Sequence, residues 1–155
     1  MRILIIGPSL DHSTGGIPAV VEGLMQGLSG REGIMFKYYE YCSPLFNLGF
    51  FKRITTVCGK LMKFFVIIKR DSPSLIHMHT SIMPRGIFRD LFFVMLITIF
   101  RIPFVYELHG GRVRPLHGIF RYMFTCLMEL ASGVVLTSRE QEQELLFPQC
   151  AALLP

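Results

Sequence analysis

The sequence contains no tryptophan, and only 17% of its 155 residues are charged. With 51% hydrophobic residues, so low a charge content excludes a disordered or strongly acidic chain. The formal net charge is +5, but the basic residues are spread along the chain and are not combined with a base-stacking motif. We therefore expect a folded domain that attracts anionic ligands or an anionic membrane surface, and no nucleic-acid partner.

Paired cysteines are absent as well. The four cysteines stand far apart, with no C-x-x-C pair and no framework typical of small secreted domains. This spacing predicts free thiols in a reducing cytoplasm, and the residues concerned are Cys42, Cys58, Cys126 and Cys150.

Long hydrophobic runs are also lacking. The longest uncharged apolar run, from Leu91 to Phe100, is about half of the roughly 20 residues that span a bilayer. The N-terminal run MRILIIG carries one basic residue and is too short for the core of a signal peptide. These features predict a cytoplasmic protein without a transmembrane segment, in contact with the inner membrane face at most.

Short apolar runs alternate with longer helix-like stretches, which is typical of parallel strands joined by helical crossovers. The length suits one domain over residues 1–155, so the pattern predicts a doubly wound, Rossmann-like α/β sheet. Strands are expected at residues 2–6, 35–41, 75–79, 104–108 and 133–136. Helices are expected at residues 17–28, 50–69, 85–100, 116–130 and 139–146, the last with a capping box that begins at Ser138.

In such sheets, ligands bind beyond the carboxyl ends of the strands. After the first strand, a loop ending in Gly15 and Gly16 exposes backbone N–H groups at a helix start, which outlines an anion site. A plain glycine turn explains the same residues. The spacing of the loop is neither that of the dinucleotide fingerprint nor that of a P-loop. A nicotinamide-dependent oxidoreductase, in which this loop would bind the pyrophosphate and Glu40 the ribose of the cofactor, is therefore a less favoured alternative.

Histidines mark the ends of the third and fourth strands. His77 and His79 share one face of a strand because side chains alternate, and His109 follows the next strand in the segment ELHGGR. With Arg85 and Arg89 nearby, they predict a site for a polar, anionic substrate, with imidazole available for hydrogen bonding or proton transfer. His77 on its own is most simply explained as a buried histidine with a backbone partner.

A zinc site formed by His77, His79 and His109 is a further alternative. The sequence argues against it, because no His or Cys pair has helical metal spacing and neighbouring strands would have to bring three rings to one point. No metal and no cofactor are therefore expected. A serine hydrolase is excluded by the absence of a G-x-S-x-G motif.

The stretch from Phe50 to Arg70 contains six basic residues and no acidic one, interleaved with phenylalanine and aliphatic residues. Such a helix can lie on an anionic membrane with its apolar side down. A core helix with a solvated basic edge explains the same pattern.

Five segments, taken in order, resemble the N-terminal domain of the retaining nucleotide-sugar glycosyltransferases of glycosyltransferase family 4, which have the two-domain GT-B architecture. The segments are MRILIIGPSLDHSTGGIPAVVEGL, SLIHMHTS, IPFVYELHGG, ASGVVLTSREQEQEL and ALLP. The resemblance implies that the chain binds the acceptor, a polysaccharide or glycolipid precursor, while a second domain binds the sugar nucleotide.

The resemblance also implies roles for single residues. His109 matches a catalytic histidine that hydrogen-bonds the transferred sugar or the acceptor without acting as a nucleophile. The implied substrate-binding residues are Gly15, Gly16, His79, Ser81, Arg85, Gly110, Ser138 and Glu140.

The carboxylate motif and the basic phosphate clamp of that family belong to the C-terminal donor domain, which is absent from these 155 residues. We therefore expect the chain to be inactive alone and to represent the N-terminal half of a hexosyltransferase. A non-catalytic subunit that works with a separate catalytic chain is the alternative.

Overall fold

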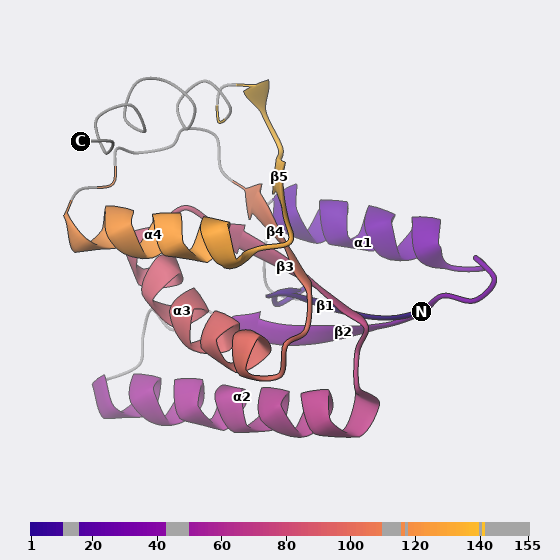
Figure 1. The fold of residues 1–155 in the computed structure, drawn as a ribbon, viewed down its shortest axis with the longest axis horizontal. Coiled ribbons are helices and arrows are strands. Elements are labelled where there is room, and N and C mark those ends of the chain that lie inside the picture. Colours follow the sequence, from indigo (N-terminus) through magenta and orange to yellow (C-terminus); the bar gives the residue numbers. More distant parts are fainter. Residues whose placement is uncertain (11–15, 43–49, 110–115, 117, 140, 142–155) are drawn as a thin grey trace.

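The structure, a computed structural model, describes residues 1–10, 16–42, 50–109, 116, 118–139 and 141. Five strands alternate with four helices along the chain (Figure 1). The strands are β1 (Arg2–Pro8), β2 (Met35–Cys42), β3 (Leu75–Ser81), β4 (Phe104–His109) and β5 (Gly133–Leu136). The helices are α1 (Gly16–Leu28), α2 (Phe50–Asp71), α3 (Pro84–Ile99) and α4 (Ile119–Leu130).

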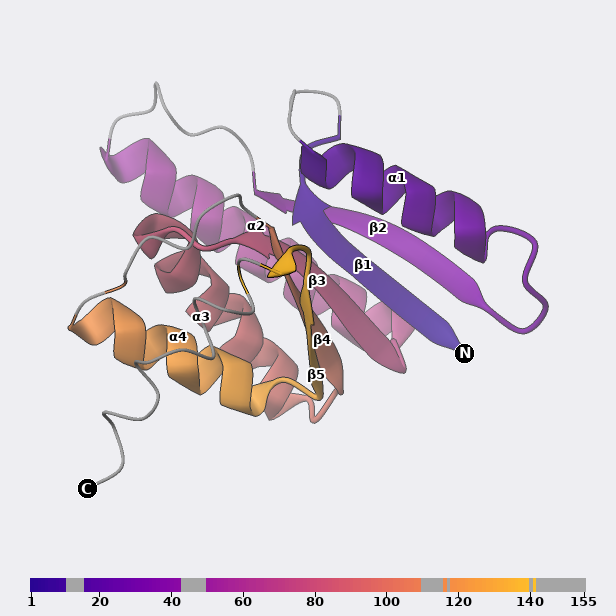
Figure 2. The ribbon, with the colours of Figure 1, turned by 90° about the horizontal axis from the view of Figure 1, so that it is seen from above.

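All five strands run parallel in the order β2-β1-β3-β4-β5. The helices cover both faces: α1 lies on one side beside β1 and β2, and α2, α3 and α4 lie on the other (Figures 1 and 2). This arrangement confirms the predicted doubly wound, Rossmann-like α/β fold.

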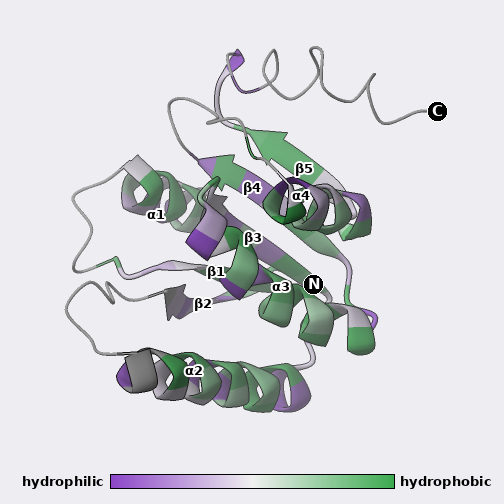
Figure 3. Cartoon of the chain, turned by 90° about the vertical axis from the view of Figure 1, so that its left-hand side faces the viewer, coloured by the Kyte–Doolittle hydropathy of each residue, from purple (hydrophilic) through white to green (hydrophobic). Residues whose placement is uncertain are grey.

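Apolar residues on both sides of the central strands explain the two helical layers. In β1, Leu4 and Ile6 pack into the larger core with α2, α3 and α4, whereas Ile3 and Ile5 pack toward α1 with Val21. Hydrophobic residues predominate along α3, which lies over the middle of the larger core (Figure 3). A strand buried on both faces needs this continuous apolar run.

Most predicted elements match the observed ones to within a few residues. The main difference is that β3 and β4 continue through Ser81 and His109, so both residues are paired in the sheet and do not follow it in a loop. The predicted helix at residues 139–146 lies largely outside the described residues. Of the described helices, none is both long and apolar enough to cross a bilayer.

Candidate functional site

The candidate site lies at the carboxyl ends of β3 and β4, which are neighbours in the sheet. His79 is in register with Glu107, and Ser81 is in register with His109. Paired residues of parallel strands project to the same face, and alternate residues share that face. His77, His79, Glu107 and His109, called here the histidine–glutamate cluster, therefore stand together on the face that also carries α1.

The Glu107 carboxylate lies at the centre of this cluster. Its Oε2 is 2.8 Å from Nε2 of His77 and 3.6 Å from Nδ1 of His79, and its Oε1 is 3.2 Å from Nε2 of His109. Nδ1 of His79 and Nε2 of His109 are also 3.0 Å apart. One carboxylate thus contacts three imidazoles from two strands.

The three rings are stacked in series. The centroids of His77 and His79 are 4.4 Å apart, and those of His79 and His109 are 5.3 Å apart, with interplanar angles below 30°. The sequence argued against a zinc site because neighbouring strands seemed unable to bring three rings to one point. The register of β3 and β4 makes the three rings neighbours, stacked in series and not converging on one point.

Burial sets the charge state of the cluster. His79 is fully buried, which is the main reason why its pKa is lowered to about 4; the charge of His77 acts in the same direction. Burial opposes ionisation of Glu107, but hydrogen bonds from His109 and His77 outweigh it and hold the pKa of this carboxyl well below its usual range. At neutral pH the site therefore combines an ionised carboxylate with a neutral His79.

The proton arrangement of this site leaves Nε2 of His79 unused, whereas Nε2 of His77 lies 2.8 Å from the Glu107 carboxylate. The single Nε2 proton of His109 can be shared between the Glu107 carboxylate and Nδ1 of His79, and His79 then carries its own proton on Nε2. Among the described residues, Nε2 of His79 has no hydrogen-bond partner. A buried nitrogen without a partner is costly, so this atom is a candidate contact for a ligand.

Two predicted acceptor-side residues, Ser81 and Arg85, follow His79 of the histidine–glutamate cluster closely in the sequence. Ser81 is half-buried at the last position of β3 and Arg85 is exposed in the first turn of α3. The Ser81 carbonyl lies only 3.1 Å from where a Cβ on Gly86 would stand, so glycine allows α3 to start close to the strand end. Ser81 and Arg85 therefore both lie at the carboxyl edge of the sheet.

Other predicted residues are placed differently. Gly16 begins α1 and is exposed. The Ser138 hydroxyl accepts a hydrogen bond from the backbone N–H of Gln141 at 3.2 Å, which confirms the predicted capping interaction and gives this serine a structural role. Gly15, Gly110 and Glu140 lie outside the described residues.

A second polar cluster, on the opposite face, was not anticipated from the sequence. Asp90 of α3 is fully buried and accepts hydrogen bonds from the hydroxyls of Tyr41, Thr80 and Tyr106 at 3.0, 2.5 and 2.9 Å. Arg89 adds an ion pair at 2.6 Å and also donates to Tyr41. The only sequence signal for this cluster was the Arg89-Asp90 pair directly before a long apolar run in α3.

Two further expectations concern α2 and its neighbour β2. Glu40, the residue for a ribose in the oxidoreductase alternative, forms an ion pair with Lys60 at 3.0 Å. Phe64 and Ile68 are buried in the core, so α2 packs against the sheet, while its outward side exposes large apolar residues and lysines. The core-helix explanation therefore holds for the inner side of α2, and the membrane contact stays a prediction.

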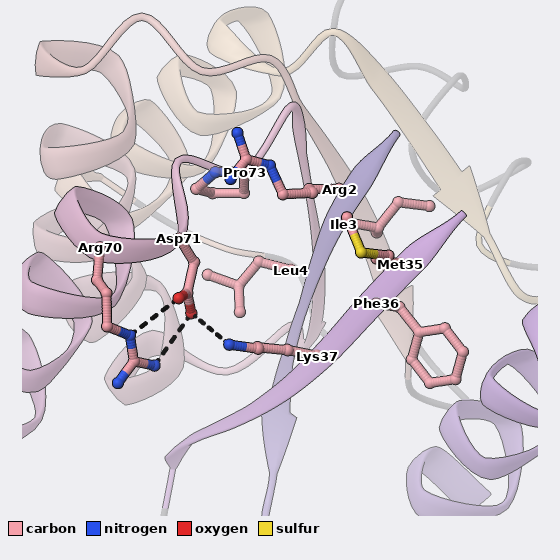
Figure 4. A pocket seen from close by; sticks show the side chains of 9 residues that line it. All are labelled: Arg2, Ile3, Leu4, Met35, Phe36, Lys37, Arg70, Asp71 and Pro73. Carbon is pink, nitrogen blue, oxygen red and sulfur yellow. Dashed lines mark hydrogen bonds and ion pairs between the residues drawn. The ribbon is translucent and has the colours of Figure 1, made fainter. Parts of the chain in front are cut away.

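A pocket lies at the other end of the sheet, where β1 and β2 begin (Figure 4). Three of its polar side chains contact one another: Asp71 lies 3.0 Å from Lys37 and 2.9 Å from Arg70. Because β1 and β2 begin here, this pocket lies at the edge opposite to the predicted site and takes no part in that site.

No family model matches this sequence, and no curated protein matches it at a significant level. The fold and the site geometry are accordingly the basis for the function proposed below.

Proposed function

We propose that this chain is the acceptor-side domain of a retaining glycosyltransferase of GT-B architecture, which transfers a sugar from a nucleotide-sugar donor to a polysaccharide or glycolipid acceptor. One observation carries the proposal: His109 ends β4 with the Glu107 carboxylate behind it and His79 and Ser81 on the adjacent strand. This places hydrogen-bonding groups at the edge where open parallel sheets bind ligands.

In this proposal His109 hydrogen-bonds a hydroxyl of the transferred sugar or the acceptor. The 3.2 Å contact between Glu107 and Nε2 of His109 orients the imidazole and fixes its tautomer. Arg85, exposed at the start of α3, provides a cation for an anionic acceptor. Holding both substrates in line lowers the entropic part of the barrier, so these residues act chiefly by positioning.

The donor belongs to the second wall of the cleft. Gly16, at the N-terminus of α1, leaves backbone N–H groups accessible to the donor phosphates. Stabilisation of the departing diphosphate falls to amides and cations, most of them in the donor domain. The chain alone is then expected to bind an acceptor without transferring a sugar.

The experiment that tests the proposal is ligand-detected NMR on the 155-residue chain, with a panel of oligosaccharides, short-chain glycolipids and nucleotide sugars. We expect saturation transfer to an acceptor-type glycan, and loss of this signal in His109→Ala and Ser81→Ala. Ser132→Ala is the matched control, since Ser132 is exposed at the amino end of β5. Absence of binding to every glycan, or binding that both site variants retain, would refute the proposal.

A membrane contact through α2 is part of the same proposal, because a lipid-linked acceptor lies at a bilayer surface. Lys52, Lys63 and Lys69 are exposed on this helix. So are several large apolar side chains, namely Ile54, Met62, Phe65 and Val66. The adjacent helix α3 adds Phe88, Met95 and Ile99, each more than half exposed. Apolar residues bordered by lysines match an anionic lipid surface.

Co-sedimentation with phosphatidylglycerol vesicles tests this contact. Replacing Lys52, Lys63 and Lys69 together by glutamine should weaken binding by on the order of 100-fold, since each lysine near the surface contributes about 1 kcal/mol. The control replaces Arg2, Arg31 and Arg139 by glutamine in the same way. These three residues are exposed outside α2, and their replacement removes the same charge. Equal losses in both triple variants, or equal binding to neutral vesicles, would contradict a specific contact through α2.

A further inference from the structure

The geometry points to a divalent metal site of the zinc class, with His77, His79 and Glu107 as its three protein ligands. It goes beyond the proposed function and does not depend on it. The set differs from the three-histidine site considered from the sequence, because Glu107 takes the place of His109.

Donor spacing is the first argument. One donor atom each from His77, His79 and Glu107 can be chosen so that all three lie within 4.8 Å of one another. Oε2 of Glu107 is 2.8 Å from Nε2 of His77 and 3.6 Å from Nδ1 of His79. Ligands at the usual zinc distances of about 2.0–2.2 Å lie roughly 3.4 Å apart in a tetrahedral site, and both separations from the carboxylate oxygen are close to that value.

Donor chemistry is the second argument. Two imidazoles and one carboxylate form the ligand set of zinc sites that keep a fourth position for water or substrate. Histidines at alternate positions of a strand share one face, and the adjacent strand supplies the carboxylate opposite His79. The ligands therefore come from two rigid, hydrogen-bonded strands, which fixes their positions better than a loop would.

The surroundings of the three ligands form the third argument. His79 is fully buried, and its Nδ1, the ring nitrogen nearer to the Glu107 carboxylate, is the atom that would bind the ion. The side chain of His77 remains 17% exposed, so an ion can reach the site from that side. Nε2 of His109 contacts Oε1 of Glu107 at 3.2 Å, so His109 would orient the carboxylate ligand from the outer shell.

Calorimetric titration of the EDTA-treated full chain with zinc chloride tests this site. We expect saturable binding of one ion per chain and a tetrahedral cobalt(II) absorption spectrum without thiolate charge-transfer bands. His77→Gln should weaken binding by at least about 100-fold, because a direct ligand is lost and even outer-shell losses cost 10- to 100-fold. Glu107→Gln should do the same, and His77→Gln, at the partly exposed ligand, keeps the test valid if Glu107→Gln fails to fold.

Two control variants separate this site from adventitious binding. His117→Ala removes a histidine outside the proposed set, and the double variant Cys58→Ser, Cys126→Ser removes free thiols. Both should bind zinc as the parent chain does. The inference is overturned if no stoichiometric binding occurs, if His77→Gln binds normally, or if the thiol variant loses the ion. None of these readouts uses a sugar, so they are independent of the glycan-binding experiment.

Discussion

The two faces of the sheet each carry a buried polar cluster on the same two strands, and the clusters are built on opposite principles. Even-numbered Thr80 and Tyr106 face α3, whereas odd-numbered His79 and Glu107 face the side of α1. Alternation along β3 and β4 separates the two sets by the thickness of one sheet. Buried polar groups that satisfy one another maintain the fold, whereas buried polar groups with unused hydrogen-bonding capacity are suited to a ligand.

The cluster around Asp90 is closed. Three hydroxyls and the Arg89 guanidinium all donate to one carboxylate, which balances its charge and satisfies its oxygens. Arg89 also lies 4.2 Å from the Tyr41 ring centroid, where a cation is favoured. Such a network leaves no position for a ligand, so its role is to join α3, β2, β3 and β4.

The histidine–glutamate cluster is incomplete by the same criteria. Its groups are acceptors, or imidazoles that both donate and accept, and Nε2 of His79 has no partner among the described residues. Of the described helices, only α1 lies on this face, beside β1 and β2 (Figure 2). A cluster with unused polar capacity is the better candidate for a ligand site than one that is fully satisfied.

The largest expected effect breaks the closed cluster. Asp90→Ala leaves several buried donors and the Arg89 charge without their acceptor, and should lower the free energy of unfolding by about 3–5 kcal/mol. Urea denaturation followed by circular dichroism measures this change. Asp90→Asn, which keeps one carbonyl oxygen as an acceptor, should cost less than Asp90→Ala. A loss below about 1 kcal/mol for Asp90→Ala would show that the network is not structural.

A smaller effect on stability is expected at the incomplete cluster. Glu107→Gln keeps the size and one acceptor oxygen but removes the charge, so its cost should be about 1.5–3 kcal/mol, that of a charge-assisted hydrogen bond. Glycan binding should nevertheless fall sharply, because His109 loses its orienting partner. Urea denaturation and NMR saturation transfer on the same sample distinguish the two outcomes. If Glu107→Gln is destabilised but still binds glycan fully, Glu107 stabilises the fold and does not serve a ligand site.

The smallest effect is expected for the exposed ion pairs at the opposite edge. Hydrogen bonds with Arg70 and then Lys37 lower the pKa of the Asp71 carboxyl to about 2. Their stabilisation is thus complete above the ordinary pKa near 3.8 and is lost as the pH falls toward 2. Asp71→Asn should lower Tm by less than about 2 °C at pH 7, and the difference should shrink near pH 2. A constant difference across this range would mean that the carboxylate charge is not responsible.

Local sequence patterns were sufficient for most of the secondary structure. The apolar runs of β1 and β4 predict buried strands because such residues must be covered on both faces, and proline and glycine mark where helices begin or end. The third strand was predicted to end at His79 because Thr80 and Ser81 are polar, although both residues continue β3. Backbone pairing with β4, which the pattern does not show, extends the strand.

The sequence by itself determined that His77 and His79 share a face and that His109 lies near the end of the next strand, because alternation is a local property of an extended chain. Only the tertiary structure decided that Glu107 stands opposite His79 and that Asp90 meets Tyr41, Thr80 and Tyr106. Residues joined through a whole crossover helix have no local constraint on their register. That register is set when α3 packs on the sheet and buries its apolar side.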